Sequence, residues 1–134
     1  MIWAVALGSA VGGVARLLLG GALQRVSGST FPVWTLVINV TGSLALGFLM
    51  RYLGEGVTVS AEARALLTVG FCGGYTTFST FSFETMTMFE QGDWRRGSLY
   101  VVASVTLSLL AVGGGMALAR AMIGAMRGRG GMLG

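Results

Sequence analysis

The residues best suited to ion chemistry lie in one apolar segment of membrane length. Residues 70–84 read Gly-Phe-Cys-Gly-Gly-Tyr-Thr-Thr-Phe-Ser-Thr-Phe-Ser-Phe-Glu, so two adjacent glycines are followed by Phe side chains among hydroxyls. The glycines predict a break in the helix near Gly73 and Gly74. Hydrocarbon offers no water to an exposed backbone, so a helix broken at membrane depth persists only inside protein or beside a polar path. The segment therefore predicts an ion or solute site.

Two of the Phe residues are placed to act together. Phe78 and Phe81 are three positions apart, which makes them neighbours on one face of a helix. An aromatic ring is negative on its face and positive at its edge, so rings presented edge-on would suit a small anion and rings presented face-on a cation. Ordinary packing is the alternative for any such pair. A break would also free backbone carbonyls, which are ligands for hard cations such as Na⁺.

Polar residues recur every four positions in two other apolar segments. One stripe is Thr35, Asn39 and Ser43, and the other is Tyr100, Ser104 and Ser108. Such spacing places each set on one helix face, where the two could line a polar track. Alternatively, the hydroxyls bond their own backbone or join helices together. Asn39 is the strongest candidate, because an amide in the middle of a span must find partners.

Two charged residues lie inside the spans. Arg16 is the only cation well inside one, at a cost of roughly 2.5–3.5 kcal/mol on insertion scales. It either extends to one interface or attracts anions to a vestibule. Glu84 is the only acid at comparable depth, and either a proton relay or a polar anchor paired with Arg or Tyr would explain it. Cys72 fits a small buried hydrophobe.

The composition limits the class of protein. Of the 134 residues, 54% are hydrophobic and 10% are charged, whereas soluble domains carry about 25% charged residues. All nine basic residues are Arg, set mostly at segment ends, and they form no basic stripe for nucleic acid. Histidine is absent and cysteine occurs once, which excludes an internal disulfide and a cysteine metal cage. These features indicate a multi-pass membrane protein.

The charges divide the chain into four spans, near residues 2–23, 32–50, 65–89 and 98–118. Each approaches the roughly 20 residues that cross a ~30 Å hydrocarbon core. The chain starts without a charged leader region, so we expect it to be mature, and we expect 124–134 to be a flexible tail. The predicted fold is a single all-α domain, residues 1–134, of four transmembrane helices with the third broken at mid-membrane.

Charge and small residues bear on assembly. If Arg127 and Arg129 of the tail count little, the Arg residues on the two sides of the membrane nearly balance, which favours insertion in either orientation. Ordinary insertion with both termini inside is the alternative. Small residues at helical spacing would let helices approach closely, and this supports association of copies only weakly. These pairs are Gly8 and Gly12, Ser43 and Gly47, and Gly113 and Ala117.

At these residues the chain closely resembles the small dual-topology fluoride channels of the Fluc/CrcB family. The resemblance rests on residues 70–82, is supported by residues 31–42 and 12–16, and extends over nearly the whole chain. It implies an antiparallel homodimer in the lipid bilayer, with two fluoride pores at the interface and a central structural Na⁺. Such channels let toxic cytoplasmic fluoride leave the cell passively through the plasma membrane, which is the inner membrane in bacteria.

The resemblance also implies roles for individual residues. Backbone carbonyls of Gly73 and Thr76 would hold the Na⁺. The pore and its polar track would take Asn39, Phe78, Phe81, Ser79, Thr35, Tyr100, Ser104, Ser108 and Glu84, and Arg16 would lie at a vestibule. Two positions depart from the family pattern: Trp34 stands where Gly is usual, and Leu17 stands where an aromatic residue is common.

Three other classes of function compete with passive conduction. A proton-coupled small multidrug exporter of cations needs an acid in its first helix, which here holds Arg16 and no acid, so Glu84 would have to substitute. An accessory membrane subunit would leave the break and the Phe–hydroxyl motif unexplained. An enzyme is the least favoured, because no nucleophile–base pair occurs at a plausible spacing. We therefore expect a fluoride channel and no enzymatic activity.

Overall fold

The computed structural model describes residues 1–130 of the chain, and the side chains of residues 1–128. Each element in this part is helical: α1 (Ile2–Ser27), α2 (Val33–Arg51), η1 (Tyr52–Gly56), α3 (Ala61–Ala65), η2 (Leu66–Cys72), α4 (Gly73–Tyr75), α5 (Phe78–Glu90) and α6 (Trp94–Gly130). The elements η1 and η2 are wound as π-helix. The all-α expectation is confirmed.

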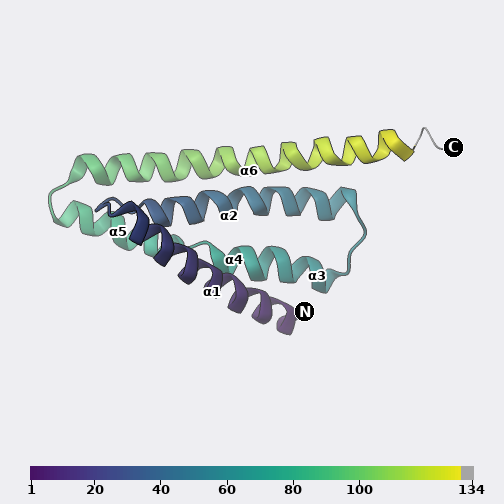
Figure 1. The fold of residues 1–134 in the computed structure, drawn as a ribbon, viewed down its shortest axis with the longest axis horizontal. Coiled ribbons are helices and arrows are strands. Elements are labelled where there is room, and N and C mark those ends of the chain that lie inside the picture. Colours follow the sequence, from purple (N-terminus) through teal and green to yellow (C-terminus); the bar gives the residue numbers. More distant parts are fainter. Residues whose placement is uncertain (131–134) are drawn as a thin grey trace.

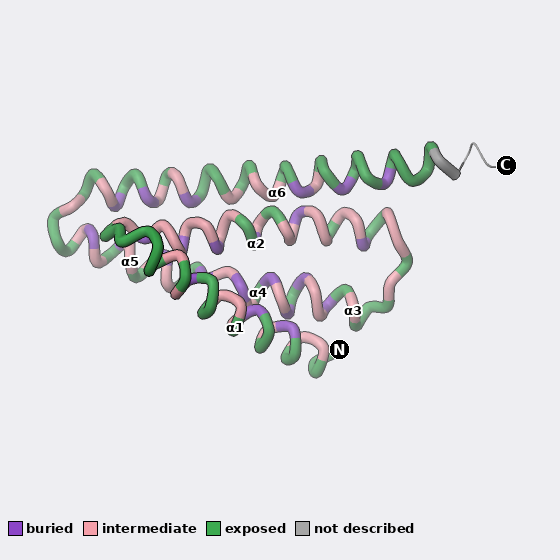
Figure 2. Tube along the Cα trace, in the orientation of Figure 1, coloured by how far each residue is buried: buried purple, intermediate pink, exposed green. Residues whose placement is uncertain are grey.

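Three stretches are long and apolar enough to cross a membrane: Ile2–Ser27, Val33–Gly56 and Trp94–Gly128. Most residues of α1 and α6 are exposed (Figure 2), whereas those of α2 are mostly half-buried or buried. Leu7, Leu18 and Leu109 are among the large apolar side chains left exposed. A surface of this kind suits lipid and not water. The predicted third span is instead divided among α3, η2, α4 and α5, so a fourth crossing stays a prediction.

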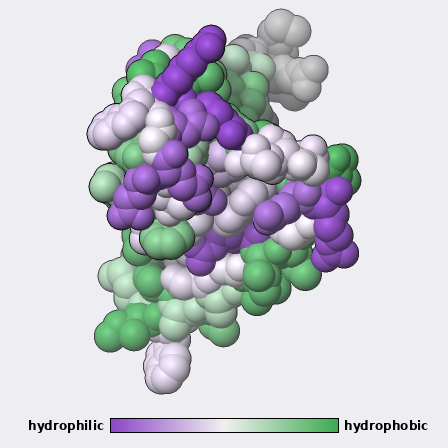
Figure 3. Space-filling model, turned by 90° about the vertical axis from the view of Figure 1, so that its left-hand side faces the viewer, coloured by the Kyte–Doolittle hydropathy of each residue, from purple (hydrophilic) through white to green (hydrophobic). Residues whose placement is uncertain are grey.

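The helices form a slab with α2 at its centre. Helices α2 and α6 run side by side in the same direction, and the chain of short helices from α3 to α5 returns the opposite way between α1 and α2 (Figure 1). Seen from the end where α6 begins, hydrophilic side chains gather over the helix connections while apolar groups cover the flanks (Figure 3). This distribution is that of a membrane protein with a polar end.

Glycines let the helices touch backbone to backbone. A Cβ at Gly8 or Gly12 of α1 would overlap the backbone of η2, and one at Gly47 of α2 would overlap that of Val112 in α6. Around Gly113, in contrast, there is open space. The predicted use of Gly8, Gly12 and Gly47 between copies is therefore corrected. Their small size serves packing within one chain, because helices without side chains at the crossing approach more closely.

The break in the third span lies at Thr76 and Thr77, which corrects the prediction of a break at Gly73 and Gly74. Thr76 (φ −78°, ψ 159°) and Thr77 (φ −148°, ψ 107°) are extended, whereas Gly73 is helical. Gly74 is needed for packing, since a Cβ there would lie 2.8 Å from the Cα of Ser9 in α1. The break itself is made by Thr77, whose Oγ1 accepts from the amide of Thr80 (3.2 Å) and so starts α5.

The helix α6 continues beyond the predicted span. Residues 124–130, expected in a flexible tail, are helical, and residues 131–134 of that tail lie outside the described residues. The extension is supported by η1: Ile123 is buried beside Gly56, and Arg127 donates to the carbonyl of Glu55 at 3.2 Å. Contact with η1 adds packing that a solvated tail would lack.

We predict that Gly12→Ala lowers the free energy of unfolding by about 1–3 kcal/mol, because the added methyl forces α1 away from η2. Denaturant unfolding of the protein in detergent micelles measures this. Gly13→Ala is the matched control, because nothing lies within 4 Å of the position of its Cβ. Equal stability of the two variants would contradict the packing described for α1.

Candidate functional site

A groove of about 340 Å³ runs along the face formed by α2, the broken third span and α6. It brings together most of the residues that the sequence pointed to. Those lining it are Asn39, Gly73, Thr76, Phe78, Phe81, Ser104 and Ser108. Segments far apart in the chain therefore meet in one polar and aromatic groove.

The side chain of Asn39 bridges the broken backbone. Its Oδ1 accepts from the amide of Thr77 at 2.8 Å, and its Nδ2 donates to the carbonyl of the same residue at 3.1 Å. Both backbone groups of the extended residue are thus satisfied from α2. An amide carries two N–H donors, so one proton of Nδ2 remains beyond this pair. The need of Asn39 for a partner, anticipated from its type, is met by the helix break.

The same contacts release two carbonyls. In a continuous helix the amide of Thr77 would donate to Gly73, and that of Thr80 would donate to Thr76. Here Thr77 donates to Asn39 and Thr80 donates to the hydroxyl of Thr77. Gly73 and Thr76 both line the groove. Their carbonyl oxygens are therefore available as ligands for a hard cation, which fits the Na⁺ predicted for them.

The ring pair lies at the start of α5. Phe78 and Phe81 have centroids 5.5 Å apart with ring planes tilted by 48°. Phe81 is buried against Tyr100, with centroids 5.2 Å apart, whereas Phe78 is 79% exposed. One ring is thus held by the core and the other projects from the chain. Packing within this chain explains Phe81 in part and leaves Phe78 unexplained.

Glu84 is anchored by two hydroxyls. Its Oε1 accepts from Thr35 at 2.8 Å and its Oε2 accepts from Tyr100 at 2.7 Å. Both partners are completely buried. Hydrogen bonds to a charged acceptor are stronger than neutral ones, which stabilises an acid at this depth. Of the two readings of Glu84, these contacts describe the polar anchor, with Tyr100 as the predicted kind of partner.

Ser104 and Ser108 continue the stripe from Tyr100 along α6. Ser104 is only 6% exposed, yet among the described residues its Oγ has no hydrogen-bond partner. A buried hydroxyl without a partner costs free energy. Because the same residue lines the groove, that cost is understandable if the groove holds a polar ligand at times.

Arg16 and Ser79 lie elsewhere. They line a second hollow of about 810 Å³ between α1 and the start of α5, together with Gln24, Trp34 and Thr80. The side chain of Arg16 has no ion pair within residues 1–128. The structure thus separates Ser79 from the ring pair with which the sequence grouped it. Trp34 is among the residues that line this hollow.

The role of Thr77 and the contact between Thr41 and Tyr75 were not predicted from the sequence. Thr77, noted only as one of several hydroxyls, both starts α5 and binds Asn39. Thr41 and Tyr75 share a hydrogen bond of 3.0 Å between α2 and α4. The signal for Thr77 was present, since Thr three positions before Thr80 suits a helix N-cap. No local pattern points to the pair Thr41 and Tyr75, because their contact is tertiary.

Comparison with known proteins now bears on this groove. Residues 3–116 match the family model of CrcB-like proteins, described as Camphor Resistance (CrcB). The chain belongs to the CrcB family. A protein of Rhizobium meliloti named fluoride-specific ion channel FluC is 45% identical over 119 residues, which are 89% of this chain and 95% of the relative. The matched region includes every residue of the groove.

Two more relatives carry the same name. The FluC protein of Sphingopyxis alaskensis is 46% identical over 119 residues, 89% of this chain and 94% of its own. That of Koribacter versatilis is 43% identical over 121 residues, 90% of this chain and 95% of its own. The long apolar helices and the family membership together identify the chain as a multi-pass membrane protein, which in bacteria is located in the plasma membrane.

We predict that removal of two buried hydroxyls of α6 has different effects on the free energy of unfolding. Ser104→Ala should leave the free energy of unfolding unchanged or raise it, because the Oγ has no partner in residues 1–128. Tyr100→Phe should lower it by about 1.5–3 kcal/mol, because the bond to Glu84 is lost. Thermal and denaturant unfolding in micelles compare the two. A large loss of stability in Ser104→Ala would mean that its hydroxyl does have a partner.

Proposed function

We propose that this protein is a passive, fluoride-selective ion channel that lets cytoplasmic fluoride leave the cell. The single observation that carries the proposal is a groove that joins one exposed and one buried aromatic ring, Phe78 and Phe81, to neutral hydrogen-bond donors. Relatives over nine-tenths of their length bear the name fluoride-specific ion channel. The activity is conduction and not an enzymatic reaction.

The lining of the groove suits a small anion that holds its water strongly. A pore must replace the hydrogen bonds of the hydration shell with groups of its own. The candidates are the second Nδ2 proton of Asn39, the hydroxyls of Ser104 and Ser108, and the ring edges of Phe78 and Phe81. These donors carry no full charge, so they can bind the ion without trapping it.

A second copy would complete each pore. The groove is open on one side and Phe78 projects from the chain, so one subunit offers only part of a wall. The near balance of Arg residues at the two ends favours pairing with an inverted copy. Twofold symmetry would then repeat the groove, which gives two equivalent pores in an antiparallel homodimer.

A structural Na⁺ fits the centre of such a dimer. The carbonyls of Gly73 and Thr76 lack their helical donors, and an inverted partner would contribute the same pair. A bound cation would neutralise the carbonyl dipoles where the two breaks meet and would join the subunits. This chain's own part is to hold the segment 73–76 in a fixed shape, through Asn39 and the capping hydroxyl of Thr77.

A proton-coupled exporter of cations receives less support. Helix α1 contains no acid, and both carboxylate oxygens of Glu84 are engaged by hydroxyls. The exchange of a proton for a cation at Glu84 would require these bonds to break. Passive conduction requires no such step.

The proposal predicts fast fluoride efflux from liposomes that contain the purified protein, together with negligible chloride efflux. A fluoride-selective and a chloride-selective electrode record the two fluxes against protein-free vesicles. Comparable chloride flux would contradict selectivity, and uptake of a cation driven by a pH gradient would revive the exporter.

Two groove variants should lower fluoride flux by about tenfold or more, the effect of a change of ~1.4 kcal/mol in a barrier or an affinity. Phe81→Ile removes an aromatic edge, and Asn39→Asp replaces the N–H donors by acceptors that repel an anion. The matched control is Phe83→Ile, because Phe83 is a Phe of α5 that is exposed and outside the groove. Chemical crosslinking checks that each variant remains a dimer. Wild-type flux in both groove variants would place the pore elsewhere.

A further inference from the structure

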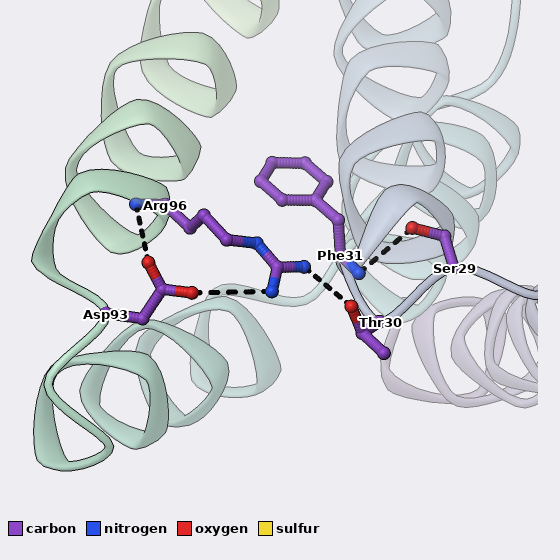
Figure 4. A network of polar contacts seen from close by, with 5 residues as sticks. All are labelled: Ser29, Thr30, Phe31, Asp93 and Arg96. Atoms are coloured by element: carbon purple, nitrogen blue, oxygen red, sulfur yellow. Dashed lines mark hydrogen bonds and ion pairs between the residues drawn. The ribbon is translucent and has the colours of Figure 1, made fainter.

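A polar network joins two connections at one end of the molecule. In Figure 4 the side chain of Arg96, from the first turn of α6, reaches across to the loop before α2 and donates to Thr30 Oγ1 at 2.8 Å. Its other terminal nitrogen pairs with Asp93 at 3.3 Å. Asp93 also accepts from the backbone amide of Arg96 at 3.2 Å, which fixes the start of α6. We refer to Thr30, Asp93 and Arg96 as the clamp.

Phe31, the residue after Thr30, connects the clamp to the buried ring of Tyr100. Phe31 stands edge-on to Tyr100, with centroids 5.4 Å apart and planes at 81°. Phe81 packs on the same tyrosine. Tyr100 is thus held between a ring of the loop and a ring of the groove, and it is fully buried. Edge-to-face pairs of this kind contribute stability beyond the area that they bury.

The clamp and the groove share a helix face. Arg96 precedes Tyr100, Ser104 and Ser108 at intervals of four residues, which places it one turn beyond the end of the polar stripe on α6. The loop that it holds leads directly into α2, whose Thr35 donates to Glu84. Both hydroxyls that bind Glu84 therefore follow segments that the clamp fixes.

We propose that Arg96 is a positioning residue for conduction: through Thr30 and Phe31 it holds the ring of Tyr100, and thereby Glu84, in place at the end of the polar stripe. This rests on the proposed channel function. When the clamp is released, the loop at residues 28–32 loosens and water gains access to the buried hydroxyls. The side chain of Arg96 acts through its neighbours and does not touch the ion.

The neighbouring Arg95 provides a matched control. Both variants, Arg96→Gln and Arg95→Gln, remove one positive charge from the same turn of α6, but Arg95 is exposed and has no hydrogen bond or ion pair in the described part of the chain. A general electrostatic effect at this end would appear in both variants. An effect of the clamp would appear in Arg96→Gln alone.

The first experiment measures fluoride efflux from liposomes. We expect Arg96→Gln to lower the flux about two- to fivefold, because the Arg96 side chain is 41% exposed and a contact this exposed contributes less than a buried one. Arg95→Gln should keep the wild-type flux. Thr30→Val removes the acceptor and should lower the flux similarly, whereas Thr30→Ser keeps it and should restore conduction. Arg96→Gln and Arg95→Gln conducting equally would overturn the proposal, as would full conduction in Thr30→Val.

Two further readouts separate positioning from a general loss of structure. Combining Arg96→Gln with Phe31→Leu should give little additional loss, because both changes act through Tyr100, and a double-mutant cycle measures that coupling. Amide hydrogen exchange of residues 28–36 in micelles should become faster in Arg96→Gln and not in Arg95→Gln. Additive losses or unchanged exchange would overturn the proposal. If wild-type protein conducts no fluoride, the proposed function fails, while the exchange experiment still tests the clamp.

Discussion

The pairing of Asn39 with the backbone of Thr77 is the interaction on which the rest of this structure depends. An extended residue inside an apolar chain leaves its N–H without a helical partner, and hydrocarbon supplies none. The carboxamide of Asn39 accepts from this N–H at 2.8 Å and also donates to the C=O of the same residue at 3.1 Å. The break can therefore persist, and with it the free carbonyls of Gly73 and Thr76 and the N-terminus of α5 that bears Phe78.

Close helix contact makes this pairing possible. Asn39 reaches Thr77 only because α2 lies close to the broken span, where Gly42 leaves room for the side chains of Thr76 and Tyr75. On the opposite side of the broken span, Gly8, Gly12 and Gly74 allow α1 to pack closely against it. The polar site thus depends on close backbone contacts between helices at their glycines, and this mode of helix association suits lipid.

Much of the fold and of the candidate site could be predicted from the sequence, and the features that could not be predicted have physical causes. The long apolar spans follow from hydropathy, and Asn39, Ser104 and Ser108 of the groove follow from spacing by four. Phe78 and Phe81 follow from spacing by three, whereas the roles of Gly73 and Thr76 were implied only by the resemblance. The position of the break could not be predicted, because a glycine can mark either a flexible backbone or a close approach of two helices. At Gly74 it marks the close approach of α1. The partners of Glu84 and the separation of Ser79 from Phe78 are tertiary facts, since no local pattern says which face of α5 meets α2. The dimer, the ion and the roles of single residues in the pore stay predictions.

The parallel arrangement of α2 and α6 has a consequence for biogenesis. These two helices touch through Gly47 and Gly115. Parallel neighbours cannot form a hairpin, so the chain must first return along α3 to α5 before α6 can pack on α2. The contact between α2 and α6 therefore joins segments that are far apart in the sequence. Because contacts of large sequence separation cost loop-closure entropy before they form, we expect the docking of α6 on α2 to be a late step of folding.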